Sequence, residues 1–190
     1  MWYFSSDWHL GHENVIRFSK RPFSSVEQMD SAIIKNMTSP LKRGDEFFFL
    51  GDLSWNIPVG ERFFYSLPEG VQFHWILGNH DYDKYLKPFE QYCASISTIK
   101  ELKPAKDQLL VLCHYPMISF NKSHHNAWQL YGHHHRRPNG KDNLFPNFQG
   151  KRLNINLEFH DFKPLTLKDV EQHMAKQPDN WDYLSKTKAD

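Results

Sequence analysis

Hydrophobic residues along the chain gather in short runs, and each run ends in, or leads into, a cluster of polar residues. The runs of strand length lie at 2–6, 46–50, 71–77, 109–113 and 127–131. A continuous apolar run of this length, bounded by Gly and polar residues, is typical of a strand buried on both faces. The segment 151–174 closes the chain's pattern with a further strand and a helix.

Helical periodicity separates several of these runs. Apolar residues recur at helical spacing between about Ser25 and Met37, and Ser24 or Ser25 is placed to cap that helix. A second helix is expected from Ile57 to Leu67, because Pro58 favours the first helical turn. Strands that alternate with helices predict an α/β fold built of βαβ units, in which ligands bind at the carboxyl ends of the strands.

Length and composition indicate one ordinary globular domain. The chain has 190 residues, of which 39% are hydrophobic and 24% are charged, and its net charge is +1. We expect a single domain over 1–177 and a polar C-terminal tail over 178–190. A nearly neutral chain offers no extended basic track, so long nucleic acid is not an expected partner. Nothing in the sequence indicates the oligomeric state.

The sequence also favours a cytoplasmic location. Two cysteines, Cys93 and Cys113, cannot form a disulfide framework, which points to a reducing compartment. The first residues lack the basic start and apolar core of a signal peptide. No run approaches the ~20 apolar residues of a membrane span, so we expect no membrane partner.

The polar clusters at the ends of the runs carry the chemistry of a metal site. In chain order they contain carboxylate, amide and imidazole groups: Asp7, His9, Asp52, Asn79, His80, His114, His133 and His135. These groups suit divalent transition metals, and the absence of thiolates argues against a structural zinc site. Even with His80 set aside, two carboxylates, one amide and four histidines exceed the needs of one ion, whereas two ions that share a carboxylate would use all seven groups.

The stretch YGHHHRRP at 131–138 raises the question of which histidines take part. If it continues as extended chain, side chains alternate between faces, so His133 and His135 point one way and His134 the other. In this interpretation His134 takes no part in the site that His133 and His135 face.

The motifs D-x-H, G-D, G-N-H-D, H and G-H-x-H occur in this order over residues 7–135, and the chain therefore resembles the calcineurin-like metallophosphoesterase superfamily. The stretch 156–167 also looks like the closing strand of small members. The resemblance implies two packed, mostly parallel β-sheets flanked by helices in a four-layer sandwich.

The resemblance also implies roles for the motif residues. Asp7, His9 and His135 would hold one ion, Asn79, His114 and His133 the other, and Asp52 would bridge both. His80 would stand beside the scissile phosphate and assist the leaving group. The ions would be divalent, with manganese favoured and iron, zinc, nickel or cobalt as alternatives, and a hydroxide held between them would attack phosphorus.

One departure from the family pattern bears on the substrate. Protein phosphatases of this superfamily extend the second motif to G-D-x-V-D-R-G, but here Trp55 and Asn56 replace its second Asp and its Arg. A protein phosphatase is therefore disfavoured, and the residue that orients His80 is open, with Asp81 adjacent to it. The expected activity is hydrolysis of a small or nucleotidic phosphodiester. The alternatives are a phosphomonoesterase and a non-catalytic interaction scaffold.

Several residues near the motifs are candidates for substrate binding. His12 and Asn14 follow the first motif and either line the pocket or cap the next element. Arg136 follows the last motif, and Arg21 follows the first; either could grip phosphate or lie in an ordinary turn. Aromatic rings close to the motifs, Trp8, Trp55 and Tyr115, could stack on a base or simply pack the core.

Overall fold

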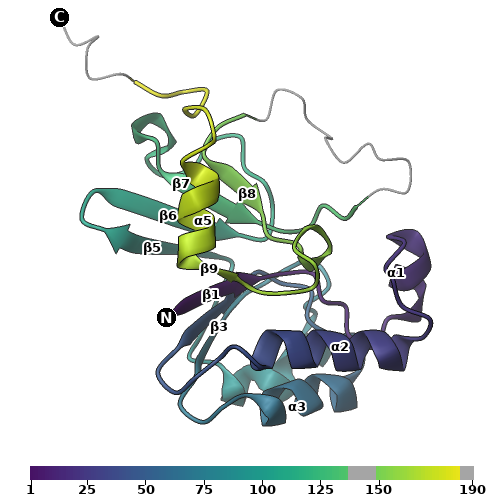
Figure 1. Cartoon of the computed structure of the whole chain (residues 1–190). Helices are drawn as coiled ribbons and strands as arrows, with labels where there is room; N and C mark the ends of the chain where they lie inside the picture. The colour runs from purple at the N-terminus through teal and green to yellow at the C-terminus, as the bar shows by residue number, and fades with distance from the viewer. Residues whose placement is uncertain (137–148, 185–190) are drawn as a thin grey trace, which may run out of the picture.

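The computed structural model describes residues 1–136 and 149–184. Within these ranges the strands form two sheets (Figure 1). The first has the order β4-β3-β2-β1-β9, with β1 at Trp2–Ser5, β2 at Glu46–Phe49, β3 at Gln72–Ile76, β4 at Ser95–Ser97 and β9 at Leu165–Thr166. The second has the order β5-β6-β7-β8, with β5 at Ile99–Ala105, β6 at Gln108–Cys113, β7 at Trp128–Tyr131 and β8 at Arg152–Asn154. Neighbours pair in parallel except β1 with β9 and β5 with β6.

Local sequence accounts for where the main helices begin. The helices are α1 (Glu13–Phe18), α2 (Val26–Thr38), α3 (Ile57–Ser66), α4 (Asp83–Leu86) and α5 (Leu167–Met174), with 3₁₀ turns η1 (Lys87–Tyr92), η2 (Ser123–His125) and η3 (Leu157–Phe159). The Ser25 side chain caps α2 by accepting from the Gln28 backbone N–H. Asn56 caps α3 in the same way and Pro58 lies in its first turn. The two helices predicted from periodicity are confirmed.

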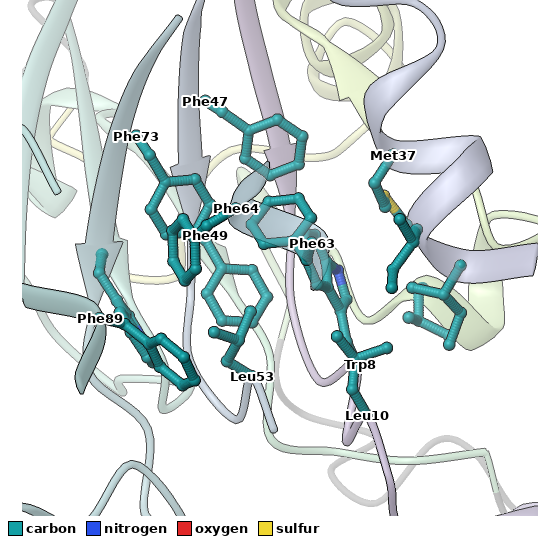
Figure 2. Close-up of a cluster of buried hydrophobic side chains, with 14 of the residues drawn as sticks. Trp8, Leu10, Met37, Phe47, Phe49, Leu53, Phe63, Phe64, Phe73 and Phe89 are labelled. Atoms are coloured by element: carbon teal, nitrogen blue, oxygen red, sulfur yellow. The ribbon is translucent and has the colours of Figure 1, made fainter. Parts of the chain in front are cut away.

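The first sheet is buried on both faces, which explains its continuous apolar strands. In β2, Phe47 and Phe49 join the core on the side of α2 and α3, whereas Phe48 faces the other way, toward the second sheet. Figure 2 shows Phe47, Phe49 and Phe73 projecting from the strands toward the ring of Phe63 and the side chain of Met37. Alternation along a strand therefore supplies two cores at once.

The second core joins the two sheets. Phe4, Phe48 and Ile76 from the first sheet meet Leu112 and Leu130 from the second, and α5 closes this core with Val170 and Met174. In Figure 1, α5 lies across the strands, and α2 and α3 cover the opposite face of the first sheet. Two mostly parallel sheets flanked by helices are thus confirmed.

Two strands escaped prediction because their sequence lacks a continuous apolar run. In β5 exposed and half-buried positions alternate, and its antiparallel pairing with β6 makes it the edge of the second sheet. The three residues of β4 are all half-buried. Both cysteines are free thiols. None of the helices in the described ranges is long and apolar enough to cross a membrane.

The described part of the C-terminal stretch packs against the domain. The Asn180 amide donates to the carbonyls of Ser123 and Ala127, and its oxygen accepts from the Lys151 N–H. The Trp181 indole N–H donates to the Ile118 carbonyl. The polar tail predicted over 178–190 is thus held against the domain by these hydrogen bonds, and 185–190 lie outside the described residues.

The assignment of the core over the first sheet can be tested with two aromatic residues of α3, one buried and one exposed. Phe63 is fully buried and Tyr65, two residues on, is 70% exposed. Phe63→Ala should lower the free energy of unfolding by about 3–5 kcal/mol, because it removes a ring from a packed core. Tyr65→Ala should cost less than about 1 kcal/mol. Chemical denaturation of both variants measures the difference, and equal losses would contradict this assignment of the core.

Candidate metal centre

Polar side chains from the first and last motifs meet where β1 and β7 end. His9 Nε2 lies 3.1 Å from His135 Nε2, and His135 Nε2 lies 3.7 Å from Asp7 Oδ1. Ligand atoms of these three residues all lie within 4.8 Å of one another, so they could hold a metal ion. The motifs are more than a hundred residues apart, and parallel strands bring them to one edge of the sheets.

A second group lies at the ends of β3, β6 and β7. Asn79 Oδ1 is 3.0 Å from His114 Nε2 and 2.9 Å from His133 Nδ1, so an amide oxygen and two imidazole nitrogens converge. Asp52 stands between the two groups: its Oδ2 lies 3.6 Å from His9 Nε2 and 3.6 Å from His114 Nε2. Imidazole, carboxylate and amide donors without thiolate fit two divalent ions that share one carboxylate.

Four of these residues adopt a left-handed backbone conformation. The φ angles are 60° for Asp7, 51° for His9, 62° for Asp52 and 66° for His133. Such angles are uncommon for residues other than glycine and cost roughly 1–3 kcal/mol each. They persist because hydrogen bonds fix the neighbouring backbone: Asp7 N–H donates to the Gly51 carbonyl and His9 N–H to the Asp52 carbonyl.

The three consecutive histidines do not continue a strand. β7 ends at Tyr131, His133 is left-handed, and the His134 N–H bonds to the Gly132 carbonyl at 2.7 Å. The alternation argument is therefore wrong as a mechanism, although His133 and His135 do enter the two groups. A Cβ at Gly132 would collide with Asp7 and Ser6, so only glycine lets this turn approach. The His134 carbonyl accepts from the Asn154 amide instead.

Burial shifts the charges of the centre. Burial raises the pKa of Asp7, which is fully buried, and lowers the pKa of His9 well below its usual value. The pKa of His133 falls to about 4, because of burial and the neighbouring His114. These imidazoles are neutral near pH 7, which is the form that binds metal.

His80, the expected leaving-group residue, lies beside this centre. Its ring centroid is 5.5 Å from that of His9, and its backbone N–H donates to Asp52 Oδ1. His80 Nδ1 is buried with no hydrogen-bond partner among the described residues, and the same is true of His12 Nδ1. A buried polar atom without a partner is costly.

Aromatic rings surround His80. Trp55 stacks on His12, with 4.6 Å between centroids, and its centroid is 5.1 Å from that of His80. Tyr82 lies edge-on to His80 at 6.2 Å, and Tyr115 lies 5.0 Å from the His133 ring. All three aromatic side chains are more than one-third exposed. Trp8, in contrast, is fully buried in the core and cannot stack on a ligand.

Other candidate residues take up structural contacts. Asn14 is exposed and accepts a hydrogen bond from Arg17. His12 precedes α1 but makes no side-chain capping bond. The Arg136 guanidinium lies over the Phe159 ring at 5.5 Å. Arg21 is buried against Glu158, with 2.8 Å between Nε and Oε1, so it cannot reach a phosphate.

Asp81 supports the centre but does not orient His80. Its carboxylate accepts from the backbone N–H groups of Gly78, Asp52 and Leu53 and from the Trp75 indole. It therefore clamps the loops after β2 and β3 together. The sequence left the residue that orients His80 open, and these hydrogen bonds of the Asp81 side chain go to other residues.

Glu158 was missed altogether. Its Oε1 accepts from His135 Nδ1 at 2.8 Å, and its Oε2 accepts from the Arg136 backbone N–H. Burial disfavours the ionised form, but the hydrogen bond from His135 and the charge of Arg21 outweigh it and lower the pKa of Glu158 to about 2. The same contact raises the pKa of His135 despite its burial. The sequence offered one clue to this role: Glu158 is an ionisable residue inside the segment that closes the chain's pattern at 151–174.

Comparison with known proteins settles the family. The family model for calcineurin-like phosphoesterases matches residues 3–184. The chain belongs to this family. It is 33% identical over 168 residues to MJ1445, an uncharacterized protein of Methanocaldococcus jannaschii, with 87% of this chain and 86% of the relative covered. A crystal structure of AQ665, a protein of unknown function from Aquifex aeolicus, superposes with a TM-score of 0.71 at 25% identity, covering 91% of this chain and 98% of that one.

Family membership supports a metal-dependent phosphoester hydrolase, and so do two groups of side chains that could hold metal ions, Asp7–His9–His135 and Asp7–Asp52–His114. The name of neither relative assigns a substrate. The substrate therefore has to be inferred from the residues of this chain.

The histidine turn generates a three-way test. His133→Ala and His135→Ala should each lose one ion and most activity, because each removes a donor from a different group. His134→Ala keeps its backbone bond to Asn154 and should cost at most about 10–100-fold. Metal stoichiometry and turnover of the three variants under saturating Mn²⁺ measure this. If all three were equally damaging, His134 would have to be a ligand or its partner.

Proposed function

We propose that the chain is a phosphodiesterase that acts on a small or nucleotidic phosphate ester with two divalent ions, manganese being favoured. Asp7, His9 and His135 would hold one ion, and Asn79, His114 and His133 the other. Asp52 would bind both. The observation that carries the proposal is the position of Asp52 Oδ2, 3.6 Å from an imidazole nitrogen of each group.

The ions, when bound, supply the Lewis acidity that activates water and neutralises charge on the phosphoryl group. The chain's own residues do the rest. Asp52 fixes the spacing of the two groups, and its Oδ1 accepts from the His80 N–H, which ties His80 to the same centre. His80, which binds no metal in this assignment, would stand beside the leaving oxygen and protonate it.

A diester is favoured over a monoester by the contacts of the arginines that the structure describes near the motifs. A phosphomonoester is a dianion at neutral pH, and arginine forks are the usual way to hold it. Of these arginines, Arg21 forms an ion pair with Glu158, and Arg136 lies over the ring of Phe159. The exposed rings of Trp55, Tyr82 and Tyr115 instead favour a substrate with a planar ring, such as a nucleobase.

The assay compares bis-p-nitrophenyl phosphate with p-nitrophenyl phosphate in Mn²⁺, Ni²⁺, Zn²⁺ and Mg²⁺. We expect metal-dependent hydrolysis with a higher kcat/KM for the diester, and loss of activity in EDTA. Faster hydrolysis of the monoester would make the protein a phosphomonoesterase. No hydrolysis with any metal would leave the scaffold role.

The two unpaired cysteines support our proposal that the protein works in the cytoplasm.

His80 has a separable prediction. His80→Ala should retain both ions but lose about 10²–10⁴-fold in turnover with an alkyl or nucleoside leaving group. The loss should be smaller for p-nitrophenyl esters, whose leaving group needs little protonation. Metal analysis and kinetics on both ester types measure this. Loss of metal in proportion to activity would show instead that His80 is a ligand.

A further inference from the structure

A buried ion pair that takes no part in the proposed chemistry lies behind the metal centre. The side chain of Arg21 is fully buried and that of Glu158 is 2% exposed, with 2.8 Å between Nε and Oε1. Replacing a buried pair by apolar residues is often neutral or stabilising, so stability alone is a weak reason for it. Its remaining hydrogen bonds show what else it does.

The Arg21 end of the pair holds the first motif. Nη2 donates to the Asp7 carbonyl at 2.8 Å, and Nη1 donates to the Trp8 carbonyl at 2.7 Å. These carbonyls belong to the segment in which Asp7 and His9 are left-handed. The guanidinium fork therefore fixes the backbone that aims both side chains.

The Glu158 end holds the last motif. Oε1 accepts from His135 Nδ1 at 2.8 Å, which places the ring proton on Nδ1 and leaves Nε2 free toward Asp7 and His9. Oε2 accepts from the backbone N–H of Arg136 at 2.8 Å, so the residue after His135 is fixed as well. A carboxylate behind a metal-binding imidazole sets the tautomer and orientation of the ring.

We propose that Arg21 and Glu158 are positioning residues that join the first and last motifs and build one of the two metal sites, the Asp7–His9–His135 site. The inference rests on the proposed metal centre. It adds an asymmetry between the two sites. In the other site, the second nitrogen of His114 donates to the Leu50 carbonyl at 2.6 Å, so a backbone group holds that ring without Glu158.

The asymmetry makes the test selective. Glu158→Gln keeps the size of the side chain but removes the charge that holds both Arg21 and His135. Titration of the apo protein with Mn²⁺ by calorimetry should show two binding events in the wild type. In the variant one event should weaken about 10–100-fold, and the other should be unchanged.

The matched control is the other Glu–His contact. Glu46 Oε2 lies 3.2 Å from His74 Nε2 at the opposite end of β2 and β3, away from the ligand groups. Glu46→Gln should change neither binding event. If Glu158→Gln also changed neither, the positioning role would be wrong while the metal centre stood. A wild type that binds no metal would remove the proposed function itself.

A measurement on the wild type covers the case in which Glu158→Gln does not fold. Long-range proton–nitrogen NMR spectra of the ring-labelled apo protein at pH 8.5, with His135 assigned by comparison with His135→Ala, report its tautomer. We expect the proton on Nδ1. A proton on Nε2 would overturn the proposal, because Glu158 could not then accept from this ring.

Discussion

The left-handed backbone at the strand ends is the constraint on which the rest of the structure depends. Asp7, His9, Asp52 and His133 all adopt positive φ, and each lies two to four residues beyond the end of a parallel strand. A residue that continued the strand would carry its side chain away from the neighbouring motifs. The sharp turn redirects each side chain to the common edge, at a cost that the surrounding hydrogen bonds must offset.

The two buried cores stabilise the fold and so offset the free-energy cost of these left-handed residues. Phe47, Phe49 and Phe63 pack on one face of the first sheet, and Phe4 and Phe48 pack between the sheets. The strands that end in ligands are therefore buried on both faces, where small displacements are costly. The centre also buries Asp7 and Asp52 together, which raises the pKa of Asp7 through burial first and through the charge of Asp52 as well. Divalent ions would offset that repulsion.

The sequence predicted the motif residues and their meeting place, because apolar runs mark strands and parallel strands share a carboxyl edge. It could not predict the turn at His133, since a left-handed residue follows from tertiary hydrogen bonds and not from local alternation. The contact between Arg21 and Glu158 could not be predicted from the sequence for a related reason. Arg21 and Glu158 lie 137 residues apart along the chain, and a lone Glu or Arg carries no periodic pattern. β5 was missed because an edge strand alternates.

The two ligand groups differ in how the fold supports them. Asn79 and His114 follow β3 and β6, and the carbonyl of Leu50, just after β2, accepts from the His114 ring, so a backbone group holds this ligand. The other group joins the first motif to the last, and side chains must brace it: Arg21 holds the Asp7 backbone and Glu158 holds His135. Side-chain braces can be removed one at a time, whereas a backbone carbonyl cannot. Replacing Arg21 or Glu158 should therefore weaken the Asp7–His9–His135 site without removing a ligand of either ion.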